Sequence, residues 1–455
     1  MTLAENIVFP LVTYACARRS NVTSRLVVSR KAQDSARVSL CRRLAIPTET
    51  IAAYEWELFS NTSLYDLAPV GAPADLKNDF FASSVEDRTL SFAELYPELR
   101  RIWVTQIQNW LSFYQRFYRD ARKFTRRMKF DGATILRLRT DVSDLHDRNN
   151  AVVRVSFRSG GDWFYKPRPA GHTKTWFKLL SRINKSGFSL PFEIPRVVCA
   201  DDHHWMEAIR PRRCANRKEE QDFWFRGGAL LYLVHCLRGV DFHAGNLVCR
   251  GDQPIFIDCE TLGHPETAMP GKVAVKERGL FRTGILPRPT PGVDSVAALG
   301  VMTFRRMSGK RPHMGRVIPG LTAANGFRSM HSFLRVESRR DGIVPWIQQQ
   351  LSRHQCRVVY RPTAHYYAVL LHSFSPRLLR DECSRSDFLM RACRTPHLAS
   401  PITRREAMAL RNLDIPLFMR RASSAVKLPS TPDAERAARI IVRSVPGPAN
   451  RSQST

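Results

Sequence analysis

Two acidic elements that follow one another in the chain carry the residue types of a phosphotransferase site. Asp241 and Asn246 stand five positions apart, and Asp258 and Glu260 follow at the end of an apolar run. Kinase-type enzymes place a base, a metal-binding amide and a metal-binding carboxylate at this spacing. We therefore expect Asp241 to accept a hydroxyl proton, while Asn246 and Asp258 supply the oxygen ligands that Mg²⁺ prefers.

The neighbouring polar residues have supporting roles in this interpretation. His243 would orient a phosphate or Asp241, and Glu260 would add a metal ligand or hold Lys166. Lys166 ends a predicted strand, and Pro167 after it would fix where the ammonium group points. Each residue alone is more often a turn, cap or surface residue, so the prediction rests on their combination in chain order. The sequence has no GxGxxG, so the ordinary protein-kinase glycine loop is missing.

Local patterns predict the elements that position these residues. A helix is expected from Lys218 to Arg238, weakened in its middle by Gly227-Gly228 and ended by Gly239. A short hairpin over residues 247–257 would then return Asp258 to the loop that holds Asp241.

Upstream, residues 151–157 and 162–166 read as two strands joined by a turn, and they end at Lys166. Residues 1–128 look largely helical. Pro97 suits a first helical turn there, and Pro47, Pro69 and Pro73 are expected to break the earlier part into shorter pieces.

Downstream, we expect a loop-dominated segment over residues 266–330, because it is rich in Gly, Pro and Arg. The chain is expected to turn helical again past Trp346, with breaks at Pro376 and Pro416. Residues 441–455 have the composition of a disordered tail.

Bulk composition narrows the class of protein. The 455 residues carry a net charge of +30, which indicates an anionic partner such as ATP or an acidic peptide. The basic residues are dispersed and no nucleic-acid-binding signature accompanies them, so a nucleic acid is not the expected partner. No apolar run reaches the roughly 18 residues of a membrane span, and no signal peptide is recognisable, so we expect a cytoplasmic protein. The ten cysteines form no CxxC pair and are expected to be buried thiols.

The chain resembles a known family, the dehydratase domain of type 2 lanthipeptide synthetases (LanM proteins). The motifs that carry the resemblance span most of residues 1–440 and are the following segments: Asn6 to Val12, Asp144-x-His146, Tyr165 to Arg168, Asp241 to Asn246, Ile257 to Pro265, Arg282 to Pro287, Arg357 to Thr363, and Asp414 to Phe418. In that family the domain phosphorylates Ser and Thr of a precursor peptide with ATP and Mg²⁺. It then eliminates the phosphate to leave dehydroalanine or dehydrobutyrine.

The resemblance implies a role for each matching residue. Lys166 would contact phosphate, and Asp241, His243 and Asn246 would form the catalytic loop. Asp258 and Glu260 would hold metal and nucleotide. Asp144 and His146 would sit in the phosphate loop. Arg357 and Thr363 would serve the elimination step.

Two features depart from the family pattern. Ser143 and the stretch Asp147 to Asn150 replace the glycines usual around Asp144-x-His146, so fewer backbone N–H groups could approach a phosphate closely. The chain also ends where the cyclase half of the family would begin. We therefore expect no thioether ring closure by this protein itself, and a separate cyclase is a candidate partner beside a leader-bearing precursor peptide.

Together these patterns predict an α+β protein with a kinase-like (lipid-kinase-like) two-lobed fold and additional helical N-terminal and C-terminal elements. The expected ranges are a helical region at 1–128, a kinase-like core at 129–265, an activation and elimination segment with helices at 266–440, and the tail at 441–455. Three functions stay open: a dehydratase, a kinase that does not eliminate, and an inactive remnant that binds peptide.

Overall fold

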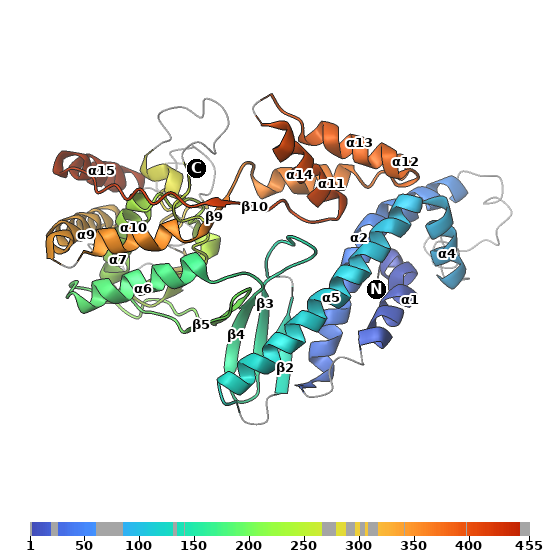
Figure 1. The fold of residues 1–455 in the computed structure, drawn as a ribbon, viewed down its shortest axis with the longest axis horizontal. Coiled ribbons are helices and arrows are strands. Elements are labelled where there is room, and N and C mark those ends of the chain that lie inside the picture. Colours follow the sequence, from blue (N-terminus) through green and yellow to red (C-terminus); the bar gives the residue numbers. More distant parts are fainter. Residues whose placement is uncertain are drawn as a thin grey trace, which may run out of the picture. The chain divides into compact units, whose positions relative to one another are not determined.

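A computed structural model gives the fold of the chain (Figure 1). It describes residues 2–19, 26–60, 85–130, 134–140, 142–265, 279–287, 296–300, 305–307, 317–340, 342–396 and 398–445. The chain divides into two compact units. Unit 1 comprises residues 1–168, 201–208 and 361–417, and unit 2 comprises residues 169–200, 209–360 and 418–455.

Unit 1 combines long helices with a sheet. Its helices are α1 (Leu3–Arg19), α2 (Arg30–Ser60), α4 (Val85–Leu95), α5 (Pro97–Arg127), α11 (Thr363–His372), α12 (Pro376–Leu379), α13 (Glu382–Cys393) and α14 (Ser400–Arg411). Its strands lie in the order β1 (Val27–Val28), β2 (Thr134–Arg139), β3 (Val153–Phe157), β4 (Gly161–Lys166) and β6 (His204–Glu207). β2, β3, β4 and β6 are antiparallel neighbours, and β1 is parallel to β2.

Helix α5 covers one face of this sheet with aromatic side chains. Pro97 occupies its first turn, as the sequence predicted. Phe124 stacks on Trp205 of β6 with ring centroids 4.3 Å apart, and Phe117 meets Tyr165 of β4 at 5.3 Å. These rings are buried, and aromatic burial of this kind is a large source of stability. The sheet that ends in Lys166 is therefore rigidly supported.

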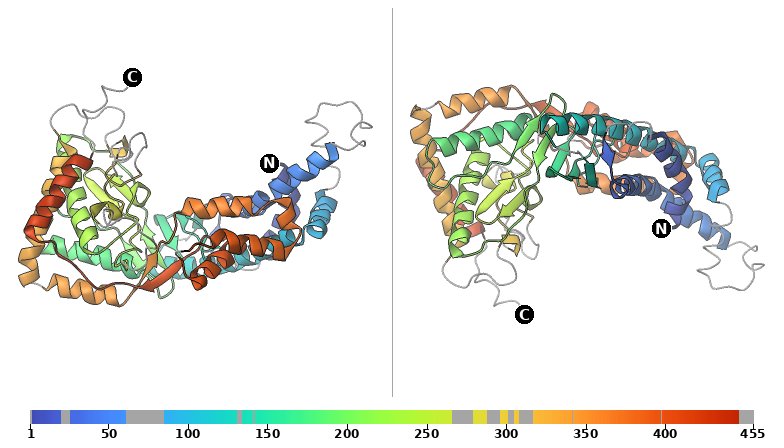
Figure 2. Two further views of the ribbon diagram at one scale, coloured as in Figure 1. Left: turned by 90° about the horizontal axis from the view of Figure 1, so that it is seen from above. Right: turned by 90° about the horizontal axis from the view of Figure 1, so that it is seen from below.

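Unit 2 contains helices, one small hairpin and one pair of strands that are distant in sequence. Its helices are α6 (Gly171–Lys185), α7 (Arg217–Cys236), α9 (Pro319–Arg340), α10 (Ile343–Ser352) and α15 (Thr431–Ser444), with 3₁₀ turns η2 (Ala244–Asn246) and η5 (Leu280–Thr283). Its strands are β5 (Val197–Cys199), β7 (Leu247–Arg250), β8 (Gln253–Phe256), β9 (Gln355–Val358) and β10 (Phe418–Arg421). β7 pairs with β8 and β9 pairs with β10, both antiparallel. Figure 2 shows α15 beside α9, against which it packs.

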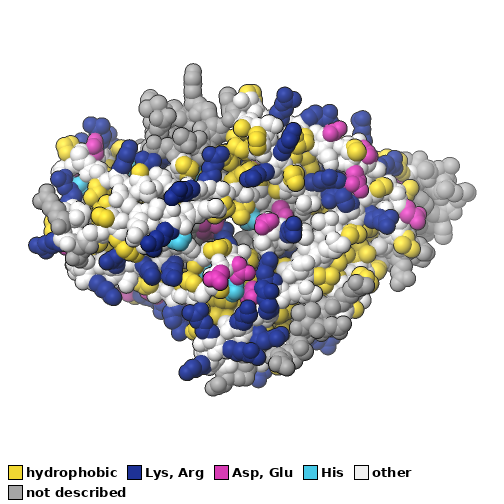
Figure 3. Space-filling model, in the orientation of Figure 1, with side chains coloured by type: hydrophobic (Ala, Val, Ile, Leu, Met, Phe, Trp, Pro, Cys, Tyr) yellow, Lys and Arg dark blue, Asp and Glu magenta, His cyan; other side chains and the backbone are white. Residues whose placement is uncertain are grey.

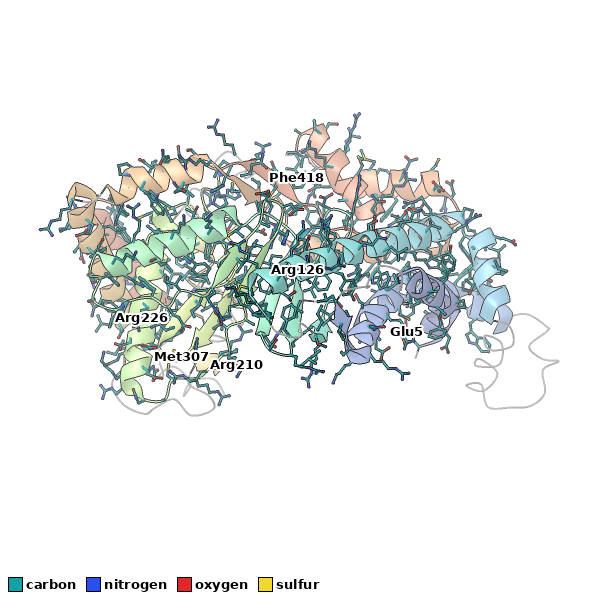
Figure 4. The ribbon with its side chains drawn as sticks, turned by 60° about the horizontal axis from the view of Figure 1, so that its bottom comes forward. Glu5, Arg126, Arg210, Arg226, Met307 and Phe418 are labelled. Carbon is teal, nitrogen blue, oxygen red and sulfur yellow. The ribbon has the colours of Figure 1, made fainter. Side chains whose placement is uncertain are left out.

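Helices α7 and α9 cross at unusually close range. A Cβ atom on Gly228 would lie 1.7 Å from the carbonyl oxygen of Ala323, and one on Gly326 would lie 1.8 Å from that of Phe225. The glycines are thus required where the two backbones meet. Gly227-Gly228 is expected from the sequence to weaken the middle of this helix. In the structure, Gly228 lies where α7 packs closely against α9. Arg226, labelled in Figure 4, ties the same helix to the β7–β8 turn through a 2.9 Å ion pair with Asp252.

Several sequence predictions are confirmed. The structure has an α+β fold, the β3–β4 hairpin ends at Lys166, and the β7–β8 hairpin follows α7. All ten cysteines have free thiols. Seven of these are buried as predicted: Cys41, Cys214, Cys236, Cys249, Cys259, Cys356 and Cys393. Among the described helices, none combines the length and the hydrophobicity that a membrane span requires.

Other predictions were wrong. Pro47 does not break its helix, because α2 continues through it while Leu44 and Ile51 bury one face. Residues 319–330 belong to α9 and not to a loop, and α10 begins at Ile343, before Trp346. Strands β9 and β10 were not anticipated.

The remaining boundaries differ in smaller ways. Helix α7 ends at Cys236, two residues before the predicted end at Arg238, and Arg238 has φ 53°, in the left-handed region. The helical run is interrupted before Pro376 as predicted, since α11 ends at His372 and Pro376 occupies the first turn of α12. Residues 441–444 lie in α15, while residues 446–455 of the expected tail lie outside the described residues, as do Pro69 and Pro73.

Candidate active site

The candidate site of unit 2 begins where α7 ends. Gly239 donates its N–H to the carbonyl of Val234, and a Cβ there would lie 2.7 Å from Val234 Cγ1. The chain therefore turns sharply against its own helix, which requires a residue without a side chain. The turn delivers Asp241 directly after the helix.

Asp241 and Asn246 are joined by a tight loop. The Asn246 side chain donates Nδ2–H to the Asp241 carbonyl at 3.0 Å, which leaves Oδ1 as the side-chain atom suited to a cation. Asp241 itself has φ 63°, a left-handed conformation that costs a residue with a Cβ on the order of 1–3 kcal/mol. The sequence prediction that these two residues lie together is confirmed.

His243 lies between them. Its Nδ1 accepts the N–H of Gly245 at 3.0 Å, which places the proton of the neutral ring on Nε2. That nitrogen lies 3.7 Å from Asp241 Oδ1. His243 is thus positioned to orient the Asp241 carboxylate, one of the two roles expected for it.

Three backbone contacts hold this loop from outside. Phe242 donates its N–H to Thr283 of η5 at 2.9 Å, and Ala244 donates to Val296 at 2.8 Å. The guanidinium of Arg306 donates to the Ala244 carbonyl at 2.7 Å. Sequence reasoning missed the Val296 and Arg306 contacts, whereas Thr283 lies in a motif it had singled out. Together they satisfy the loop's backbone and keep Asp241 in its strained conformation.

The acidic pair returns to the same place. Ile257 donates its N–H to the Asn246 carbonyl at 2.9 Å, so the β7–β8 hairpin ends beside the loop. Asp258 and Glu260 follow in a turn, and the hydroxyl of Thr261, which is buried, donates to the Val240 carbonyl. The predicted order of helix, loop, hairpin and acid is confirmed.

Arg357 holds Glu260 by two contacts. Its guanidinium Nη1 lies 2.8 Å from Glu260 Oε1, and its backbone N–H donates to the Glu260 carbonyl at 2.8 Å. Both side chains are largely buried, at 15% and 12% exposure. Burial lowers the pKa of Arg357, but the charge and hydrogen bond of Glu260, together with the charges of Asp258 and Asp241, outweigh burial and raise the pKa. Glu260 is therefore engaged by Arg357 in this state, a pairing that the sequence did not predict.

The carboxylates interact electrostatically. Burial raises the pKa of Asp241; His243 and Arg357 act to lower it, and Asp258 and Glu260 act to raise it again. A carboxyl whose pKa is raised is better matched to proton transfer near neutral pH. The repulsion from Asp258 and Glu260 also means that a cation bound here would stabilise the ionised forms.

These residues fit a magnesium ion better than a transition metal. Asn246 Oδ1 and the Asp258 carboxylate are hard oxygen ligands on two segments that are joined by the hydrogen bond from the Ile257 N–H to the Asn246 carbonyl. Within the described part of the chain, no group of three or more His, Cys, Asp or Glu side chains is arranged to hold a metal. Mg²⁺ needs no such cage, because it keeps several waters and binds substrate phosphates.

The other predicted residues lie in unit 1. Lys166 is buried at the end of β4, in register with His204 of β6. His204 Nδ1 donates to the carbonyl of Arg168 at 2.8 Å, which fixes the chain just after Pro167. The strand end is thus held in place from both sides of Lys166.

The segment that contains Asp144 and His146 is held by Asp414 and Ile415. Asp144 Oδ1 accepts the hydroxyl of Tyr367 at 3.0 Å, and His146 Nδ1 donates to the Ile415 carbonyl at 2.8 Å. Asp414 accepts the N–H of Arg148 at 2.8 Å and that of Asn149 at 2.9 Å. Two of the backbone donors expected to meet a phosphate are therefore occupied by a carboxylate of the same chain.

Thr363, the second residue expected to serve elimination, is half-buried in the first turn of α11. The ten residues singled out by sequence thus divide between the units. Unit 2 contains Asp241, His243, Asn246, Asp258, Glu260 and Arg357, and unit 1 contains Asp144, His146, Lys166 and Thr363.

Comparison with known proteins gives one result. No curated protein matches the chain. A family model described as a domain of unknown function, DUF4135, matches residues 96–317 and 322–421, which is well over half of the sequence. The chain therefore belongs to the DUF4135 family, a domain family associated with lanthionine synthetase-like proteins.

Proposed function

We propose that the protein is a lanthipeptide dehydratase of the LanM type with a kinase-like two-lobed fold. It phosphorylates Ser and Thr of a leader-bearing ribosomal precursor peptide with ATP and Mg²⁺ in the cytoplasm, and then eliminates the phosphate. The observation that carries the proposal is the loop in which Asn246 holds the Asp241 carbonyl while Ile257 docks the Asp258 turn beside it. Membership of a family associated with lanthionine synthetase-like proteins supports it.

The residues of the loop divide the first step between them. Asp241 takes the proton of the Ser or Thr hydroxyl as that oxygen forms its bond to the γ-phosphorus and the bond to ADP breaks. His243, 3.7 Å away, orients the carboxylate. Asn246 and Asp258 would hold Mg²⁺, which neutralises charge on the phosphates.

Elimination needs a cation at the departing phosphate. A base takes the Cα–H proton of the phosphorylated residue, the electron pair of that bond forms the Cα–Cβ double bond, and the phosphate leaves with the electron pair of the Cβ–O bond. Arg357 is the candidate for this cation, because a guanidinium stabilises the negative charge that departs. Its ion pair with Glu260 also suggests that Glu260 controls where the guanidinium points.

The same ion pair favours a second candidate function. Arg357 is engaged by Glu260 at 2.8 Å. If this ion pair persisted throughout the reaction, Arg357 could not reach the phosphate, and the protein would phosphorylate its peptide without eliminating the phosphate. The two candidates differ in their product.

Mass spectrometry of the product tests both. The protein is incubated with its candidate precursor peptide, ATP and Mg²⁺. Loss of water from the peptide supports the dehydratase, and a stable phosphate adduct supports the kinase that does not eliminate. An unchanged peptide would exclude both and leave a peptide-binding remnant.

A further inference from the structure

Unit 1 contains a hollow that the proposed chemistry does not use. Its volume is about 630 Å³, and it is bounded by α2, α5, α11 and the segments 142–145 and 413–415. Most of its lining is apolar, contributed by side chains such as Ile46, Leu145, Leu370, Leu371 and Phe374. We call this hollow the apolar groove.

The walls of the apolar groove expose apolar surface to solvent. Leu371 is 63% exposed, Ile46 is 50% exposed and Tyr367 is 46% exposed. Single exposed apolar residues are ordinary, but three that line one concave surface are typical of an interaction site. Phe374 and Ile415 form a buried floor beneath them.

Basic side chains border the groove. Arg42, which is exposed, lines both the groove and a second hollow of about 520 Å³. The other basic residues of that second hollow are Arg30, Lys31 and Arg139. The two carboxylates in these linings are engaged, since Asp34 pairs with Arg37 at 3.6 Å and Asp144 accepts the Tyr367 hydroxyl. The surroundings therefore favour an anionic ligand with an apolar face.

The shape of the groove favours a helix over an extended chain. Its walls are mainly helices, whose backbone groups bond within the helix, so they offer no strand edge to a peptide. An extended peptide would leave its own N–H and C=O groups without partners against apolar side chains. A helix satisfies its backbone internally and presents apolar residues at i, i+3, i+4 and i+7.

We propose that the apolar groove docks an acidic, amphipathic, helical segment of the peptide substrate. The identity of the partner rests on the proposed peptide-modifying function; the chemistry of the ligand rests on the groove itself. The apolar face of the segment covers Leu371, Ile46 and Tyr367, and its acidic face meets Arg42 and the basic residues beyond it. Because Asp144 lines the groove, the segment docks beside a residue singled out for phosphate binding.

A synthetic helix tests the proposal with the full chain. The probe is a fluorescent 15-residue peptide with Leu at i, i+3, i+4 and i+7 and Glu at the remaining positions, and its affinity is measured by fluorescence anisotropy without ATP or Mg²⁺. We expect saturable binding, and weaker binding of a peptide with the same composition in scrambled order. A peptide with Lys in place of Glu is expected not to bind.

Substitutions at exposed positions locate the binding surface. Leu371→Glu and Arg42→Glu should each raise the Kd at least about tenfold, because one places a carboxylate in the apolar contact and the other reverses the charge of the rim. Met408→Glu, at a side chain of α14 that is 67% exposed, is the matched control and should leave the Kd unchanged. All three positions are exposed, so folding is retained; circular dichroism verifies it.

Several outcomes would overturn the assignment. Unchanged affinity in Leu371→Glu, or equal affinity for the Lys peptide, removes the groove as an acidic-helix site. A third outcome is that the chain does not bind the probe but binds phosphatidylserine vesicles. If Leu371→Glu abolishes that vesicle binding, the surface binds a membrane and not a peptide. Failure of the proposed function is distinguishable, because Asp241→Asn should bind the probe as the wild type does while losing any catalysis.

Discussion

At the scale of single residues, Arg357 and Glu260 decide how the candidate site works. The carboxylates of Asp241, Asp258 and Glu260 interact, and Arg357 is the cation among them. An arginine held by a carboxylate is preorganised, since its planar guanidinium keeps one orientation. The pair can therefore hold Arg357 ready for a phosphate that competes with Glu260.

The substitution Arg357→Ala should separate phosphorylation from elimination. Without the guanidinium, the charge of the departing phosphate is not stabilised, and phosphopeptide should accumulate at the expense of dehydrated product. Mass spectrometry over time measures both species. The variant should also lose about 1–3 kcal/mol of unfolding free energy, because Glu260 is left buried without this partner.

Two comparisons make this result specific. Arg353→Ala removes an exposed arginine two positions before β9 and should dehydrate the peptide at the wild-type rate. Arg357→Lys retains the charge and should restore part of the elimination. A fully dehydrated product from Arg357→Ala would remove this residue from the elimination step.

At the scale of elements, the segment around Asp414 clamps the loop that contains Asp144. Residues 147–149 all have positive φ, between 40° and 64°, although none is a glycine. Asp414 accepts two N–H groups of this turn, and Ile415 donates to the Leu145 carbonyl at 2.7 Å. These hydrogen bonds hold three consecutive non-glycine residues in a backbone conformation that glycine adopts more readily.

The clamp should make stability depend on pH. Burial raises the pKa of Asp414 to about 6, against the opposing effect of the two N–H groups. The folded state therefore binds a proton more tightly than the unfolded state, so this contribution is full below about pH 4 and is lost as pH rises through 6. By linkage it amounts to roughly 3 kcal/mol for a shift of about two pKa units.

Urea unfolding from pH 4 to pH 8 measures the effect. Asp414→Asn cannot ionise, so only the wild type should lose this contribution as pH rises. The unfolding free energy of the wild type minus that of the variant should therefore fall by roughly 3 kcal/mol between pH 4 and pH 8. Because other groups contribute equally to both proteins, the difference isolates Asp414. A difference that stays constant over this range contradicts the assignment.

The crossing of α7 and α9 gives a second prediction at this scale. Gly228→Ala places a methyl group 1.7 Å from the Ala323 carbonyl oxygen, so the helices must separate. We expect a loss of at least about 3 kcal/mol of unfolding free energy, as for severe overpacking. Gly279→Ala is the control, because no described residue has an atom within 4 Å of a Cβ placed there, and its thermal unfolding should match the wild type. Equal melting temperatures for the two variants would mean that the crossing is not close.

Local patterns predicted the elements that are continuous in sequence, and missed contacts between distant ones. The helix, loop and hairpin from residue 217 to 258 form within about forty residues, so their periodicity and turns were visible. The Glu260–Arg357 pair joins residues 97 positions apart, and β9 pairs with β10 across about sixty residues. Two four-residue strands carry almost no periodic signal, and only the fold brings them together.

At the scale of the whole molecule, the net charge of +30 is spread over the surface. Figure 3 shows Lys and Arg side chains across the visible face, with Asp and Glu in smaller groups. Dispersed positive charge raises the local concentration of any acidic ligand and speeds its encounter with the protein. A precursor peptide with an acidic segment would be attracted in this way before it reaches a specific groove.

This attraction should appear as a salt-dependent association rate. Raising the ionic strength from about 0.01 M to 0.15 M shortens the Debye length from about 30 Å to about 8 Å, so the association rate constant of the acidic probe peptide should fall at least about tenfold. Its dissociation rate constant, set by apolar contacts in the groove, should change little. Stopped-flow anisotropy measures both constants. A probe with Gln in place of Glu is the control, because a neutral peptide feels no long-range attraction; an equal salt dependence for the two probes would show that the positive charge does not guide the acidic peptide to the protein.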